Sequence, residues 1–205
     1  MRIAWLALLA IGVSAAQTAD RSGHYYLQNV REVGSELLLK PDGSFEFMLS
    51  YGAADYWGKG TWRGQGNAVV LNSAPDKHAP PFRLLRSAAT EAAAIHIHVL
   101  APGGQAVPNI EVVLLTEKGN LPATTGSDGV AEFPKTNPAR SAAFLVGVYN
   151  LSTKPFDLNP AHDDFTFEIN GNAISEMRFT DERLTLDGKA LVMHRPDQEM
   201  RYVKQ

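Results

Sequence analysis

The chain of 205 residues contains no cysteine. This absence excludes a disulfide framework, a thiol nucleophile and a metal site built from thiolates. Stability must therefore come from the burial of apolar side chains, and a chain of this length can bury one large hydrophobic core or two small ones.

Long apolar runs are also lacking. The run at residues 3–13 is too short to cross a bilayer with comfort, and it lies between a short positive start and a set of small residues. This pattern predicts a secretory signal peptide over residues 1–16, cleaved after Ala15 or Ala16, or alternatively after Ala19. No cysteine follows that could carry a lipid anchor, so we expect a periplasmic or secreted protein whose mature chain has no membrane span.

The chain carries no surplus of positive charge. Lysine and arginine number 19 against 22 acidic residues, which gives a formal net charge of −3, and loss of Arg2 with the signal peptide makes it more negative. Nucleic-acid binding needs a basic face, so we expect no nucleic-acid partner. The overall charge gives no support for binding to anionic lipid surfaces either.

The common catalytic signatures are missing as well. The sequence has no Gly-x-Ser-x-Gly elbow, no phosphate-binding loop and no Gly-x-Gly-x-x-Gly fingerprint. The segment Gly-Ser-Asp-Gly at 126–129 is typical of a turn, and His-Asp-Asp at 162–164 is typical of a solvated loop. We therefore expect a protein without catalytic residues and without a cofactor.

What the sequence does contain is a succession of short alternating segments bounded by Gly, Pro, Asn or Asp, which is typical of an all-β protein. A linker is predicted at 87–94, because that segment is short and has no apolar stripe. Strands are predicted at residues 24–30, 35–40, 44–51, 59–64, 67–73, 82–86, 95–100, 110–116, 130–133, 142–150, 165–170 and 174–180, followed by a hairpin and a last strand up to residue 204.

The middle of the chain resembles a known family of β-sandwich modules. An alternating first strand is followed by "GGQAVPNIEVVL", "TTGSDGVAEF" and the apolar "FLVGVYN". Over residues 94–149 this order is similar to the carboxypeptidase regulatory-like, transthyretin-like family. The resemblance implies a sandwich that stabilises, spaces or adheres, and it says almost nothing about a specific activity.

The flanking segments resemble a different fold. "GHYYLQNVREVGSELLLKPDGSFEFMLSYG" with a later "GKGTW" is similar to the opening of lipocalin-like small β-barrels, and the tail looks like the closing hairpin of the same sheet. We therefore expect a discontinuous outer barrel or sandwich at 20–90 plus 171–205, with a transthyretin-like or Ig-like sandwich inserted at 91–170. The alternative is two consecutive domains with a C-terminal extension.

His96 and His98 are the only pair with metal-ligand spacing that the sequence singles out. Residues two apart on a strand share a face, so both imidazoles lie opposite Ile97 and its apolar neighbours. Zinc needs one or two further ligands, for which the candidates are residues 162–164 and Glu111. The intradiol dioxygenases, whose core is also transthyretin-like, carry their His-x-His late in the domain, whereas this pair lies on the first strand. We therefore expect no metal and a solvent-facing pair, with a metal site as the less favoured alternative.

Aromatic residues gather in "YGAADYWGKGTW" at 51–62. Tyr51, Tyr56 and Trp57 are candidate ligand-binding residues, because aromatic rings at a barrel mouth can stack on sugars or apolar ligands. Core and hairpin packing is the alternative, and we expect Trp62 in the core.

Three functions remain open. The favoured one is an exported non-catalytic module for binding, adhesion or envelope scaffolding, with an unknown protein or small-molecule partner. The alternative is a carrier that holds a small ligand inside the outer barrel. The least favoured is a metal-dependent enzyme that uses His96 and His98.

Overall fold

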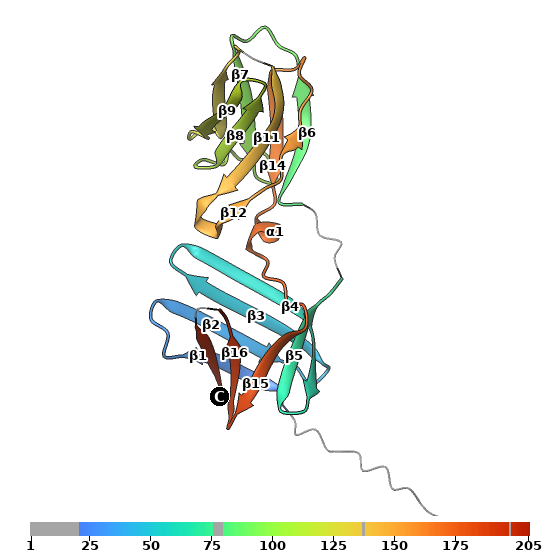
Figure 1. Cartoon of the computed structure of the whole chain (residues 1–205), viewed down its shortest axis with the longest axis vertical. Helices are drawn as coiled ribbons and strands as arrows, with labels where there is room; N and C mark the ends of the chain where they lie inside the picture. Colours follow the sequence, from blue (N-terminus) through green and yellow to red (C-terminus); the bar gives the residue numbers. More distant parts are fainter. Residues whose placement is uncertain (1–20, 76–79, 137, 197) are drawn as a thin grey trace, which may run out of the picture.

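The structure is a computed structural model, and it describes residues 21–75, 80–136, 138–196 and 198–205. The predicted signal peptide at residues 1–16 lies outside the described residues. In the part of the chain that is described, no helix has the length and apolarity needed to cross a membrane. Two β units lie one above the other along the long axis of the molecule (Figure 1).

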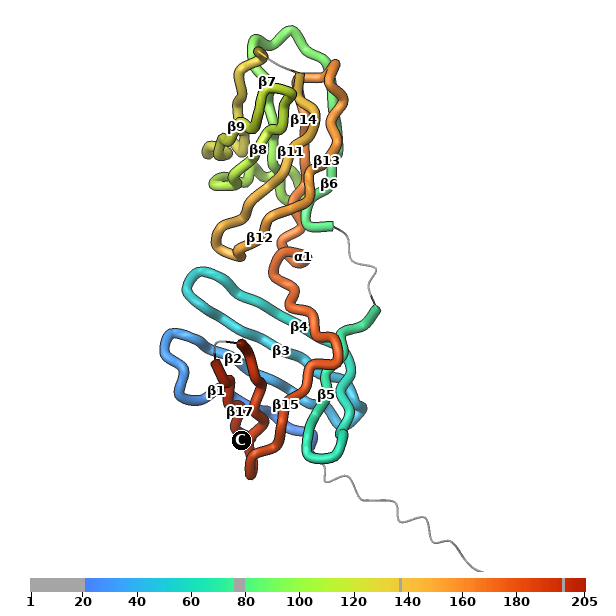
Figure 2. The backbone as a smooth tube through the Cα atoms, in the orientation of Figure 1, coloured from blue at the N-terminus to red at the C-terminus, as the bar shows by residue number. Residues whose placement is uncertain are grey.

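One unit is a closed barrel of eight antiparallel strands, in the order β1-β17-β16-β15-β5-β4-β3-β2. It combines strands from both ends of the chain, and Figure 2 shows the blue and the dark-red strands side by side. The prediction of an all-β fold with a lipocalin-like barrel is confirmed. The barrel strands are β1 (Gly23–Gln28), β2 (Val33–Leu39), β3 (Ser44–Tyr51), β4 (Ala54–Gln65), β5 (Ala68–Ser73), β15 (Glu182–Asp187), β16 (Ala190–His194) and β17 (Glu199–Lys204).

The other unit packs two sheets face to face. One has the order β10-β7-β14-β6, and the other has the order β12-β11-β8-β9, with β13 paired to β11. Its strands are β6 (Phe82–Ala88), β7 (Ala94–Leu100), β8 (Glu111–Thr116), β9 (Gly119–Thr124), β10 (Val130–Pro134), β11 (Ala139–Val146), β12 (Leu151–Ser152), β13 (Phe156–Asp157) and β14 (Asp164–Ile169), with the short 3-10 helix η1 (Gly147–Tyr149) after β11.

The predicted boundary between the two units at residues 90 and 91 is wrong. Strand β6, which we had assigned to the outer barrel, pairs with β14 of the sandwich. Phe82 explains the assignment, because it is fully buried in the sandwich core and stacks on Phe144 with ring centroids 4.3 Å apart. The boundary therefore lies between the end of β5 at Ser73 and the start of β6 at Phe82, and the segment at 89–93 is a loop within the sandwich.

The strand predicted at 174–180 is also not formed. Residues 171–175 form the short helix α1 (Gly171–Ser175), which begins where the Asn170 side chain accepts a hydrogen bond from the Ala173 N–H. The chain then runs extended beside β4, where the Met177 N–H donates to the Trp57 carbonyl at 2.6 Å. This linker replaces a regular strand along the first half of β4.

The side chain of Phe179, in the linker after α1, packs into the barrel core. Its side chain is 1% exposed, and its ring lies 5.4 Å from that of Phe45 and 5.1 Å from that of Phe47. Gly58 leaves room for it, since a Cβ there would lie 2.7 Å from the Phe179 ring. The interior of an eight-stranded barrel is just wide enough for side chains to fill it. Here one of those filling side chains, Phe179, comes from the linker and not from a barrel strand.

Candidate functional site

The open end of the barrel, called the barrel mouth below, is the site that the aromatic candidates mark. It is a hollow of about 430 Å³ between the β1–β2 loop, the β3–β4 hairpin and the start of β17. Most of its lining is apolar or aromatic, and Arg31 and Gln198 are the polar exceptions. The lining residues are Val30, Arg31, Val33, Leu49, Tyr51, Tyr56, Gln198 and Met200.

Tyr51 and Tyr56 both line the barrel mouth, and Trp57 does not. Leu49 and Tyr56 face each other across β3 and β4 on the inner face of the barrel. Trp57 comes one residue later and lies on the outer face, where its indole N–H donates to the Asn172 carbonyl at 3.3 Å. The strand alternation already separates the two positions in the sequence, so Trp57 supports the linker rather than the mouth.

The two tyrosines differ in how tightly they are held. Tyr51 is 59% exposed at the end of β3, and the structure leaves its ring open to solvent. Tyr56 is half-buried and meets Tyr149 of η1 edge-on, with ring centroids 5.5 Å apart. The sandwich therefore touches the rim of the barrel mouth through one aromatic contact.

The β1–β2 loop at the mouth adopts an uncommon backbone conformation. Asn29 and Glu32 both have φ of 61°, in the left-handed region. Asparagine tolerates this region, whereas for glutamate it is unfavourable. Uncommon backbone conformations of this kind cluster in loops that bind ligands.

Below the mouth the barrel interior is packed. Tyr202 is fully buried, and burial raises its pKa to about 12. Its hydroxyl lies 2.9 Å from Ser35 Oγ, which in turn donates to the Met48 carbonyl at 2.7 Å. Since the serine proton is used there, Tyr202 donates to Ser35 and stays neutral. This buried polar pair is therefore satisfied, and the Tyr202 ring lies 6.4 Å from the ring of Phe47 in the same core.

His96 and His98 lie on the outer face of the sandwich, opposite the buried Ile97 and its neighbours. Their ring centroids are 6.2 Å apart, and His98 Nε2 lies 3.2 Å from Asp164 Oδ2. Glu111 is not a neighbour, because β8 belongs to the other sheet. Among the described residues, no group of three or more His, Asp or Glu side chains is placed to hold a metal ion.

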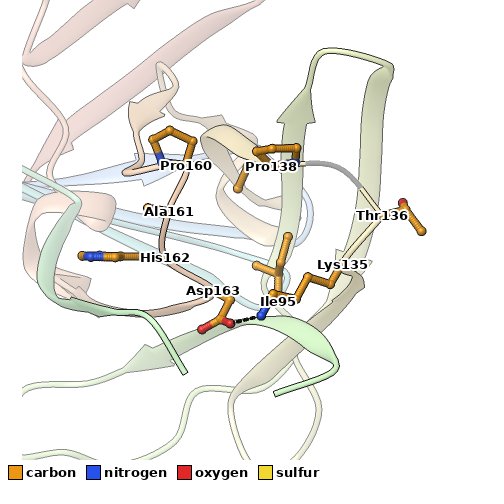
Figure 3. Close-up of a pocket in the computed structure, with 9 residues that line it drawn as sticks. Ile95, Lys135, Thr136, Pro138, Pro160, Ala161, His162 and Asp163 are labelled. Atoms are coloured by element: carbon orange, nitrogen blue, oxygen red, sulfur yellow. Dashed lines mark hydrogen bonds and ion pairs between the residues drawn. The ribbon is translucent and has the colours of Figure 1, made fainter. Parts of the chain in front are cut away.

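The remaining metal-ligand candidates are engaged at one end of the sandwich (Figure 3). Asp163 is 3% exposed, forms an ion pair with Lys135, and accepts hydrogen bonds from the N–H and the hydroxyl of Thr90. The Lys135 ammonium, helped by Thr90, lowers the pKa of Asp163 to about 2, although burial acts in the opposite direction. These contacts join three loops, so Asp163 has a structural role.

His162 has a serine neighbour, and its hydrogen bonds indicate which nitrogen faces that serine. Its Nδ1 lies 2.8 Å from Ser87 Oγ, and its Nε2 lies 3.2 Å from the Asn159 amide nitrogen. The Ala161 N–H donates to the Asn159 amide oxygen, which fixes the amide so that its NH₂ donates to His162. In this arrangement Nε2 is the acceptor and Nδ1 carries the proton, so the neutral imidazole donates to the Ser87 hydroxyl.

The sequence patterns did not mark four other lining residues of the barrel mouth, which are Val30, Arg31, Gln198 and Met200. They lie in segments that meet only because β1 pairs with β17 across the whole length of the chain. Their one sequence signal is their position beside predicted turns. Comparisons with family models, with curated protein sequences and with solved structures found no significant match to this chain.

Proposed function

We propose that this chain is an exported, non-catalytic binding protein that holds a small, mainly apolar ligand or side chain in the barrel mouth. The observation that carries the proposal is the hollow of about 430 Å³ with two tyrosine rings and a mainly apolar lining. Ligand sites typically combine such a lining with a few polar groups, and Arg31 supplies a charge at the rim.

The same geometry favours the mouth over the barrel interior as the binding site. Phe47 fills the interior together with Phe179 and Tyr202, and its ring contacts both of theirs. A carrier that enclosed its ligand in the core would have to displace them. The proposed ligand therefore binds at the rim, where Tyr51 is accessible. The proposal that the protein is exported rests on the signal-peptide pattern of residues 1–16.

The test is a titration with 1-anilinonaphthalene-8-sulfonate, whose ring and sulfonate complement the tyrosines and Arg31. We expect saturable fluorescence enhancement with the folded wild-type protein. A Tyr51→Ser, Tyr56→Ser double variant should bind about thirty-fold more weakly, since each contacting tyrosine contributes about 1 kcal/mol.

Met48→Ser is the matched control, because Met48 lies on the same strand, is 51% exposed and points away from the mouth. It should bind like wild type, and circular dichroism should show that all three proteins are folded. Equal affinity of the double variant and wild type would overturn the proposal.

A further inference from the structure

The end of the barrel opposite the mouth carries a second hollow, of about 400 Å³. The start of β1, the β15–β16 turn and the end of β17 meet there, and Figure 1 shows that turn beside the C-terminus. Tyr25 and Leu186 supply its apolar floor, and three cationic side chains, Arg21, Lys189 and Lys204, line its rim.

Three separate segments bring these cations to one end of the barrel. Lys204, in β17, follows the inward-facing Tyr202 by two positions and therefore lies on the same side of the strand. Lys189 lies in the turn between β15 and β16. Arg21 precedes β1, and its guanidinium donates to the carbonyls of Gly66, at 2.6 Å, and Ala68. Arg21 is therefore held in place, and the Lys204 side chain lies against Gly23, where a Cβ would be 2.4 Å from its Cε.

Among the described residues, no Asp or Glu side chain lines this hollow. The ion pairs of the described residues include none to Arg21, Lys189 or Lys204. Asp187, two residues before Lys189, pairs instead with Arg201 on the outer face at 2.5 Å. The Nε of Arg21 is buried and has no acceptor among the residues that the structure describes. Three positive charges are thus gathered in one hollow of a chain whose formal net charge is −3.

We propose that this cationic end binds a small multivalent oxyanion, with phosphate as the representative group. Like charges in one hollow repel each other, and an anion between them removes the repulsion while it accepts hydrogen bonds from all three. Two lysines and an anchored guanidinium suit the several oxygens of a phosphate, supplied either as a free ion or as a lipid headgroup. This site is separate from the barrel mouth.

The first arm of the test is calorimetric titration of the full chain with inorganic phosphate at constant ionic strength. We expect saturable binding. A Lys189→Gln, Lys204→Gln double variant should bind about ten-fold more weakly, since an exposed charge pair contributes up to about 1 kcal/mol. The control is Lys118→Gln, Lys154→Gln, which removes the same charge from exposed positions on the sandwich and should bind like wild type.

The second arm identifies the source of the phosphate group. Vesicles of phosphatidylcholine with phosphatidic acid should bind wild type more strongly than vesicles without it if the group belongs to a lipid, and the Lys189, Lys204 double variant should lose that difference. Saturable binding of the free ion alone identifies a soluble ligand. Absence of binding in both arms, or an equal loss in the control variant, would overturn the proposal.

Discussion

At the residue scale, Asp163 shows how a single carboxylate stabilises the sandwich. It accepts hydrogen bonds from Lys135 and Thr90 in a position that is 3% exposed, so removal of its charge leaves the lysine without its partner. Neighbouring positions behave differently, since Asp164 on the outer face contacts His98 and Arg86 and is partly open to solvent. Sequence reading treated the whole segment as a solvated loop, because burial of a loop residue depends on the loops packed around it.

Asp163 should make stability depend on pH in the acid range. The folded pKa of about 2 lies below the ordinary value of 3.8, so the stabilisation is complete above about pH 4 and is lost as the pH falls toward 2. The melting temperature of Asp163→Asn should therefore lie below that of wild type at pH 7, with a gap that narrows on acidification. Asp157→Asn, at an exposed position, is the control. A gap that stayed constant from pH 7 to pH 2 would contradict this role.

At the element scale, the linker after α1 acts as part of the barrel. Its backbone bonds to Trp57 on one side, and the Ser73 N–H donates to the Phe179 carbonyl at 2.8 Å on the other. The pattern "ISEMRFT" predicted a strand, and the chain is indeed extended there. It still forms no regular ladder, because β5 pairs with only the second half of β4 and leaves the first half to the linker.

Phe179→Ala should destabilise the barrel strongly. The substitution leaves a cavity between Phe45 and Phe47, and phenylalanine-to-alanine changes in a core cost about 3–5 kcal/mol. Urea unfolding followed by circular dichroism measures the free energy of unfolding. Leu85→Ala, at a position 47% exposed, should cost much less. Equal losses in the two variants would show that the linker merely lies on the barrel surface.

Strand β6 gives a second prediction at this scale. It forms one edge of the sandwich, and Phe82 completes the core there. A fragment of residues 81–171 should unfold cooperatively in urea. A fragment of residues 91–170 lacks β6 and should be less stable by at least about 3 kcal/mol, the loss expected for one buried phenylalanine. Equal stability would mean that β6 is dispensable.

At the scale of the whole molecule, both ends of the chain build one barrel, and this closure creates both hollows. Local alternation predicted the strands and the inner faces well, as Phe45 and Phe47 show. The resemblance to lipocalin-like barrels placed the tail in the same sheet as the N-terminal strands. The register of β1 against β17 and the gathering of three cations near Tyr25 could not be predicted, because both depend on contacts between distant segments. The two tyrosines of the mouth, Tyr51 and Tyr56, could be predicted from the sequence because they lie close together on one hairpin.

The central claim is that the barrel mouth is the ligand site, and amide shift mapping by NMR tests it most directly. The ¹⁵N-labelled full chain is titrated with 1-anilinonaphthalene-8-sulfonate. We expect the largest shifts in the β1–β2 loop at 29–32, the β3–β4 turn at 51–54 and the start of β17, with little change in the sandwich core. Shifts confined to the cationic end of the barrel, or to the sandwich, would contradict the claim.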